Sequence, residues 1–203
     1  MIDNFALLNE PRRSWIDPDA LKTKFLALSS EVHPDRVHNA SEAEKQAANQ
    51  RYSELNAAYN CLREPKERLQ HLLELELGTK PKDIQRIPAG TMDEFFEVGQ
   101  LCRQVDTFLT EKSKVTSPML KVQLFERSQE WTDKLNTLQQ KINARRETVI
   151  SELQAMNPAW EAGLNNSIER KPLLERLEEI YRLLSYFARW SEQIQERIVQ
   201  LSF

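Results

Sequence analysis

The chain has 203 residues, of which 40% are hydrophobic and 29% are charged, so it can bury a core beneath a charged surface. Its 28 basic and 31 acidic residues leave a net charge of −3, which gives no whole-protein positive field for nucleic acid. The four glycines are too few for the turns of a strand-rich fold, and the composition favours an all-α protein.

Targeting and redox signals are the next features that the sequence offers. The first residues lack the basic start and apolar run of a secretory signal, and no stretch approaches the ~20 apolar residues that span a bilayer. Cys61 and Cys102 lie far apart without a Cys-x-x-Cys pair, and are most simply buried free thiols of a reducing compartment. We therefore expect a cytoplasmic protein that does not enter a membrane.

The first predicted elements are a short apolar segment, 4–8, and a helix that begins at Asp17-Pro18. Asp17 is a suitable N-cap, and Pro18 fits the first helical position. The helix must end before Pro34, because proline disfavours helical geometry at the preceding residue. The apolar positions that follow helical spacing are Leu21, Phe25, Leu28 and Val32.

A second helix is predicted to begin at Ser41, which forms a capping-box pattern with Glu44. Its apolar stripe comprises Ala48, Tyr52, Leu55, Tyr59 and Leu62. Two amphipathic helices joined by a loop of about eight residues are expected to pack as an antiparallel hairpin. Glu64-Pro65 then opens a further short helix.

Residues 77–90 contain two glycines and two prolines and are the predicted linker between two domains, 1–76 and 91–203. After it, Thr91 and Glu94 repeat the capping-box pattern. A second long helix is predicted from Ser117-Pro118 to Asn157-Pro158, and a third from Pro172 onwards. Their three- and four-residue spacings predict a three-helix bundle, with the Trp and Phe side chains mainly in its core.

The loop His33-Pro34-Asp35 lies between the two predicted hairpin helices. It presents an imidazole and a carboxylate together at an exposed corner, where they can engage an arginine of a partner. A tripeptide of this kind also occurs in ordinary turns, so its significance depends on the surrounding sequence.

The surrounding sequence, residues 3–76, resembles a J-domain. Phe5-Ala6-Leu7-Leu8 resembles its short first helix, and the helix ending at Val32 leads directly into His33-Pro34-Asp35-Arg36. The positions that match its third and fourth helices are Tyr52, Leu55, Asn56, Ala58, Tyr59, Leu62, Pro65 and Arg68. A J-domain followed by a linker and a helical bundle resembles the HscB (Jac) family of iron–sulfur co-chaperones.

This resemblance implies a protein that binds a DnaK/HscA-type ATPase, stimulates its ATP hydrolysis and delivers an IscU-like iron–sulfur scaffold. Delivery of a different client is the alternative. The implied chaperone-binding residues are His33, Pro34, Asp35, Arg36, Lys22 and Lys24. The first hairpin helix departs from the family pattern, because 29–32 lack the usual basic residues and tyrosine. We hypothesise that Arg12 and Arg13 compensate for this missing charge.

The implied client-binding face lies at the start of the bundle and comprises Phe95, Phe96, Gln100 and Arg103. The two phenylalanines can form an apolar patch. Gly99, Gln100 and Arg103 stand where a leucine and two acids align in the family, which is a second departure from its pattern.

Two other classes of function compete with this interpretation. An enzyme would use His33 and Asp35 as acid–base or metal groups, but no third ligand at suitable spacing and no phosphate-binding loop is present. We therefore expect no catalytic residue, metal or cofactor. In a structural alternative, the C-terminal heptads form a homodimeric coiled coil with Tyr181 and Trp190 in the interface.

Overall fold

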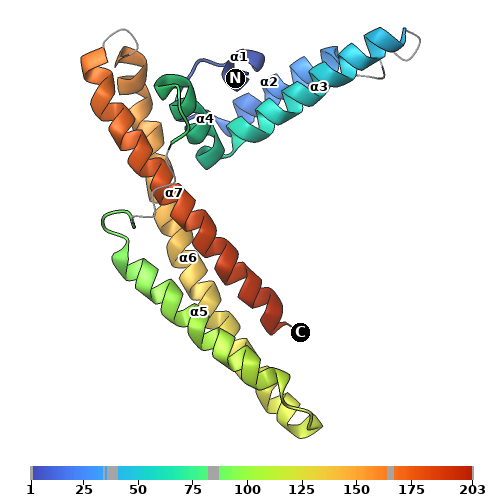
Figure 1. The fold of residues 1–203 in the computed structure, drawn as a ribbon, viewed down its shortest axis with the longest axis vertical. Coiled ribbons are helices and arrows are strands. Elements are labelled where there is room, and N and C mark those ends of the chain that lie inside the picture. Colours follow the sequence, from blue (N-terminus) through green and yellow to red (C-terminus); the bar gives the residue numbers. More distant parts are fainter. Residues whose placement is uncertain (1, 34, 36–40, 82–86, 164–166, 203) are drawn as a thin grey trace. The chain divides into compact units, whose positions relative to one another are not determined.

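The computed structural model describes residues 2–33, 35, 41–81, 87–163 and 167–202 (Figure 1). The regular elements in these ranges are helices without strands, which confirms the all-α prediction. None of the helices within them combines the length and apolarity needed to cross a bilayer.

The chain forms two compact units. The N-terminal unit comprises Met1–Lys82 and Ile150–Tyr181, and the C-terminal unit comprises Asp83–Val149 and Arg182–Phe203. The two long helices α6 (Pro118–Ala162) and α7 (Ser167–Leu201) therefore contribute residues to both units. The consecutive domain boundaries expected from the sequence stay a prediction.

The N-terminal unit begins with four helices. They are α1 (Asn4–Leu7), α2 (Pro18–Glu31), α3 (Glu42–Arg63) and α4 (Pro65–Leu77). The predicted caps are present: Asp17 accepts the Ala20 N–H at 2.8 Å, and Ser41 and Glu44 form the reciprocal capping box.

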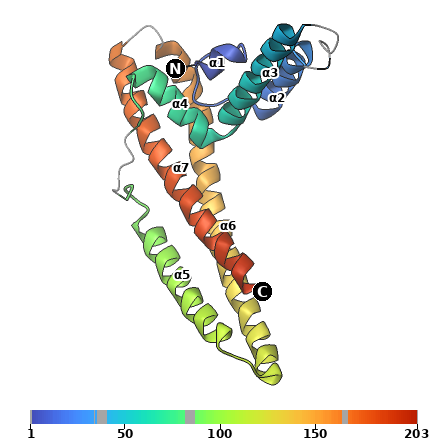
Figure 2. The same ribbon diagram turned by 45° about the vertical axis from the view of Figure 1, so that its right-hand side comes forward.

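Figures 1 and 2 show α2 and α3 side by side as the predicted hairpin. Its two helices are joined by a ring stack between Phe25 and Tyr59, with centroids 4.3 Å apart. The loop of interest connects the end of α2 to the start of α3, so this packing fixes the position of both its flanks.

The end of α6 lies elsewhere than predicted. The sequence places the end at Asn157-Pro158, but α6 continues through Pro158 to Ala162. A proline inside a helix removes one backbone hydrogen bond. The turn after Pro158 offsets this loss, because Trp160 is buried and its Nε1 donates to the carbonyl of Arg12 at 2.8 Å.

The start of α7 also differs from the prediction. The sequence places it at Pro172, whereas α7 begins at Ser167. The first turn is held by Arg170, whose guanidinium forms an ion pair with Glu76 at 2.8 Å and lies 4.3 Å from the ring of Trp160. These contacts stabilise a helical turn before the proline, which local sequence rules do not foresee.

The C-terminal unit combines α5 (Met92–Ser113) with residues 118–149 of α6 and 182–201 of α7. These three segments form the predicted three-helix bundle. Its core side chains include Val98, Cys102, Val105, Phe108, Leu135, Leu138, Ile142, Leu184, Phe187, Trp190 and Ile194. The predicted capping box at Thr91 is wrong: its hydroxyl donates to the Pro88 carbonyl at 2.8 Å and makes no cap bond.

Candidate chaperone-binding loop and client-binding face

The loop after α2 places a histidine and an aspartate at the end of the hairpin. The His33 ring lies edge-on to Tyr52 of α3, with centroids 5.2 Å apart, so α3 helps to orient the imidazole. Its Nδ1 accepts the Asp35 N–H at 3.3 Å and lies 3.5 Å from Asp35 Oδ2. The Asp35 side chain is 91% exposed. Both polar groups are therefore accessible to a partner.

The other residues assigned to chaperone binding differ from His33 and Asp35 in what the structure shows of their exposure and contacts. Pro34 and Arg36 lie outside the described residues. Lys22 is exposed on α2. Lys24 instead donates to the Asn9 carbonyl at 3.0 Å and to Glu10 Oε1 at 2.5 Å.

Glu10 explains why Lys24 is held in this way. Its side chain is 2% exposed, and its second oxygen accepts from Arg13 at 2.7 Å. A buried carboxylate is costly without charged partners, so Lys24 and Arg13 both contribute to the stability of this unit. The proposed role of Lys24 in binding a partner therefore coexists with a structural one.

Arg12 has a comparable partner in Asp3. Its guanidinium donates two hydrogen bonds to Asp3 Oδ2, at 3.0 and 2.8 Å. Burial opposes ionisation of Asp3, but Arg12 and the N–H groups of Phe5 and Ala6 outweigh it, so the pKa of Asp3 lies below its usual value. The positive charge of Arg12 is thus largely compensated within the N-terminal unit.

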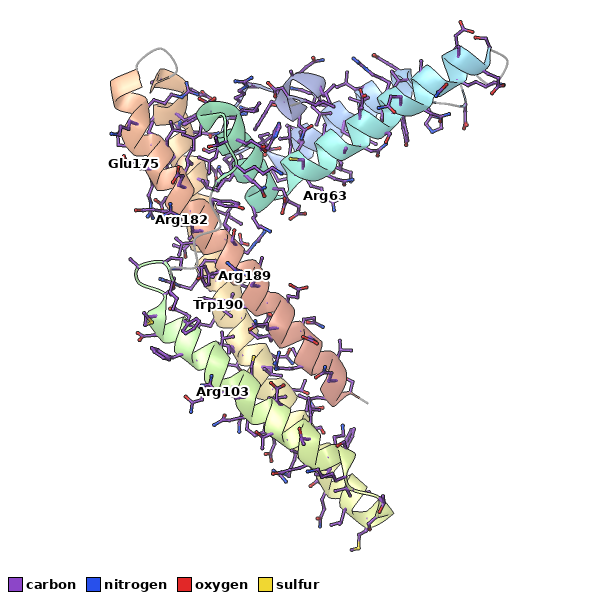
Figure 3. The ribbon with its side chains drawn as sticks, viewed as in Figure 1. Arg63, Arg103, Glu175, Arg182, Arg189 and Trp190 are labelled. Atoms are coloured by element: carbon purple, nitrogen blue, oxygen red, sulfur yellow. The ribbon has the colours of Figure 1, made fainter. Side chains whose placement is uncertain are left out.

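The four residues assigned to client binding lie on α5. Phe95 and Phe96 are 38% and 60% exposed, and their rings pack edge to face with centroids 5.7 Å apart. Gln100 and Arg103 are also exposed, and Figure 3 shows Arg103 on α5. This arrangement gives α5 an accessible apolar pair followed by polar side chains.

A groove between α5 and α6 adjoins these residues. Its volume is about 390 Å³, and its lining comprises Glu97, Gln100, Leu101, Gln104, Lys134, Thr137, Leu138 and Lys141. Lys141 and Glu97 form an ion pair at 2.5 Å, which raises the pKa of Lys141. The two lysines come from α6, so no local pattern around α5 indicates them; the antiparallel pairing of α5 with α6 is the signal that could have predicted them.

The residues considered for other roles are mostly structural. In the described ranges no group of three or more His, Cys, Asp or Glu side chains could hold a metal ion. Cys102 is buried and Cys61 is half-buried. Trp190, assigned to a dimer interface in one alternative, is buried against Tyr186 and Phe187 in the C-terminal unit (Figure 3).

Comparison with known proteins supports the class that the hairpin and its loop indicate. Residues 4–71 match the family model of the DnaJ domain, so this part of the chain is a DnaJ domain.

The chain is also similar to two curated proteins named co-chaperone protein HscB homolog. The one from Bordetella petrii is 37% identical over 99 residues, which cover 49% of this chain and 56% of that protein. The one from Azoarcus sp. is 41% identical over 73 residues, 36% of this chain and 41% of that protein. The chain therefore spans about half the length of the curated relatives it matches.

Solved structures extend the likeness to almost the whole fold. Chaperone HscB from Vibrio cholerae matches with a TM-score of 0.64 and 20% identity, covering 98% of this chain and 99% of that one. Human co-chaperone protein HscB matches with a TM-score of 0.60 and 18% identity, covering 97% and 82%. Together, these findings show the fold of an N-terminal DnaJ domain followed by a C-terminal helical domain, as in the two HscB structures.

Proposed function

We propose that this protein binds a DnaK/HscA-type ATPase through its DnaJ domain and stimulates ATP hydrolysis by that partner. The observation that carries the proposal is the exposed carboxylate of Asp35, held beside His33 at the end of a DnaJ-domain hairpin. A carboxylate in this position can form a charge-assisted bond with an arginine of the ATPase. Such a contact changes the rate only if it favours one state of the ATPase over another.

The C-terminal unit is proposed to carry the client, an IscU-like iron–sulfur scaffold. Similarity to HscB homologues and the exposed pair Phe95 and Phe96 support this part of the proposal. Gln100 and Arg103 make the face less acidic than the family pattern implies, which favours a different client as the second candidate. In either case the chain acts in the cytoplasm as a regulator without a catalytic site of its own.

A steady-state ATPase assay with the cognate DnaK-type chaperone tests the first part. We expect Asp35→Asn to lower the stimulation by about tenfold or more, as loss of a central interface charge does. Asp19→Asn is the matched control, because Asp19 is also an exposed acid of the α2 region and is outside the loop. Full stimulation by Asp35→Asn would overturn the proposal.

The same assay with the scaffold present tests the second part. Phe95→Ala/Phe96→Ala is expected to lose the scaffold-dependent stimulation while keeping the scaffold-independent part. Phe125→Ala is the control, because Phe125 is an exposed phenylalanine of the same unit on α6. If the double variant responds fully to an IscU-like scaffold, the client does not bind through this face.

A further inference from the structure

Helix α6 carries a row of cations on the side that faces α5. The row comprises Arg127, Lys134, Lys141 and Arg145, which are exposed and follow one another at intervals of seven, seven and four residues. These intervals place side chains on one face of a helix. The contacts show which face it is, because Lys141 and Arg145 pair with acids of α5 and Arg127 lies over an α5 ring. We call these four residues the α6 cation row.

Helix α5 neutralises two members of the α6 cation row. Lys141 Nζ lies 2.5 Å from Glu97 Oε2, and Arg145 Nε lies 3.3 Å from Glu94 Oε1. Exposed pairs of this kind contribute little to stability, but they cancel the local charge. The charge that remains for a partner therefore comes from the other half of the row.

The other two members, Arg127 and Lys134, lie over aromatic rings. The Arg127 guanidinium is 5.0 Å from the centre of the Phe108 ring, and Lys134 Nζ is 4.3 Å from that of Trp131. Neither forms an ion pair within the part of the chain that the structure describes. A ring attracts a cation without cancelling its charge. Both cations are therefore positioned by the fold and still able to bind an acid.

Lys134 lines the groove of about 390 Å³ between α5 and α6. The apolar part of this groove is Leu101, which is half-buried, and Leu138, which is 3% exposed. Gln100 and Gln104 of α5 add two exposed carboxamides, each of which can donate to a carboxylate. Gln100 also belongs to the client-binding face, so the groove is continuous with that face.

The charges at this groove select a partner of one sign. Its charged lining is Glu97, Lys134 and Lys141, of which Glu97 and Lys141 cancel each other. Arg103 of the client-binding face is a further exposed cation (Figure 3). Glu130 precedes Lys134 by one turn on α6, but helix pairs at this spacing are weak and do not keep an ammonium from a partner's acid. The surface where the face meets the groove is therefore positive.

We propose that this groove binds an acidic segment of the client protein, with a carboxylate at Lys134 and an apolar side chain over Leu101 and Leu138. A charge-assisted hydrogen bond to Lys134 supplies the selectivity for acids. A lipid surface fits less well, because the apolar part of the groove is recessed between two helices. A nucleic acid fits less well, because its binding requires many phosphate contacts. The inference rests on the proposed function, in which the client binds through this face of α5.

Selection of displayed random peptides of about 12 residues on the full chain tests the proposal without the ATPase or a scaffold. We expect enrichment of sequences in which an aspartate or glutamate neighbours an apolar residue. The same selection on Lys134→Glu should lose these sequences. Lys114→Glu is the control and should retain them, because it changes the net charge equally at an exposed lysine of the same unit outside the groove. Circular dichroism establishes that both variants are folded.

Fluorescence anisotropy then compares an enriched acidic peptide with a version in which each acid is replaced by lysine. We expect the wild type to bind the acidic peptide at least about tenfold more tightly, and Lys134→Glu to abolish this preference. No enrichment, enrichment without an excess of acids, or equal effects of Lys134→Glu and Lys114→Glu would overturn the proposal.

These results are separable from those that test the proposed function. If acidic peptides depend on Lys134 while Phe95→Ala/Phe96→Ala still responds fully to the scaffold, the groove assignment stands and the scaffold-binding face fails. If the peptides do not depend on Lys134 while the double variant loses its response to the scaffold, the face stands and the groove assignment fails.

Discussion

Asn157 of α6 binds the backbone of Trp15 through both ends of its carboxamide. Oδ1 accepts the Trp15 N–H at 3.0 Å, and Nδ2 donates to the Trp15 carbonyl at 2.8 Å. Oδ1 also accepts from the hydroxyl of Ser14, which is fully buried, at 3.0 Å. The segment that leads into α2 is thus fixed by a side chain 142 residues further along the chain.

Asn157→Asp should destabilise the N-terminal unit without changing the size of the side chain. The substitution replaces the Nδ2 donor with an oxygen that faces the Trp15 carbonyl, so one hydrogen bond becomes a repulsion. We expect a loss of about 1–3 kcal/mol in the free energy of unfolding, measured by urea denaturation. Asn143→Asp is the control, because Asn143 is exposed on the same helix and uses its oxygen as an acceptor from Gln139. Equal losses in both variants would show that the contact with Trp15 is not responsible.

Arg68→Lys should also be destabilising, although it preserves the charge. Arg68 is buried on α4 and donates from Nε to the Ser14 carbonyl at 2.9 Å and from Nη1 to the Leu62 carbonyl at 2.6 Å. Burial lowers its pKa to about 10, so the guanidinium stays charged at neutral pH. A lysine ammonium cannot reproduce the planar spacing of these two donors, and we expect a loss of about 1–3 kcal/mol by urea denaturation.

Arg63→Lys is the control for this substitution. Arg63 is exposed at the end of α3 and lies 5.9 Å from the ring of Tyr59 (Figure 3). Surface changes of this kind usually alter stability by less than about 0.5 kcal/mol. If Arg68→Lys costs no more than Arg63→Lys, the two carbonyl contacts are not important for stability.

Local sequence rules succeeded where the interaction itself is local. Asp17 and Ser41 cap their helices as predicted, because each side chain bonds an N–H group only three residues away. The rules failed at Pro158 and Pro172, where the hydrogen bond from Trp160 to Arg12 and the ion pair of Arg170 with Glu76 keep both prolines inside helices. Such contacts join residues far apart in the sequence, so no local pattern reveals them.

The same distinction applies to the candidate site. His33 and Asp35 are neighbours in sequence, and their joint exposure followed from the position of the loop between two helices. The contacts of Lys24 did not follow from the sequence, because they depend on the burial of Glu10, which lies in a separate loop. The lysines that α6 contributes to the α5 groove were missed for the same reason, because they belong to a different helix from the predicted client-binding residues.

Lys22 and Lys24 should separate partner binding from folding. Lys24→Gln leaves the buried Glu10 with Arg13 as its ion-pair partner among the described contacts and should lower the free energy of unfolding by about 1–2 kcal/mol. Lys22→Gln removes an exposed charge and should change stability by less than about 0.5 kcal/mol. Under the proposed function, Lys22→Gln weakens binding to the DnaK-type chaperone, measured by titration calorimetry. Unchanged affinity would remove Lys22 from the chaperone-binding surface.

His71 should make the N-terminal unit less stable in acid. Its Nε2 accepts the Asn4 N–H at 3.0 Å, and its ring stacks on Phe5, so the fold requires a neutral imidazole. Burial lowers the pKa of His71 despite the nearby carboxylates of Asp3 and Glu74.

The sign of the effect follows from this lowered pKa. Below about pH 6.5 the unfolded chain binds a proton at this histidine more readily than the folded chain, so stability falls as the pH falls. The slope for one such group is at most about 1.4 kcal/mol per pH unit. Urea denaturation at several pH values should show a steeper loss for the wild type than for His71→Gln, whose amide oxygen can still accept from Asn4. Identical pH profiles for the two proteins would show that His71 does not contribute to acid sensitivity.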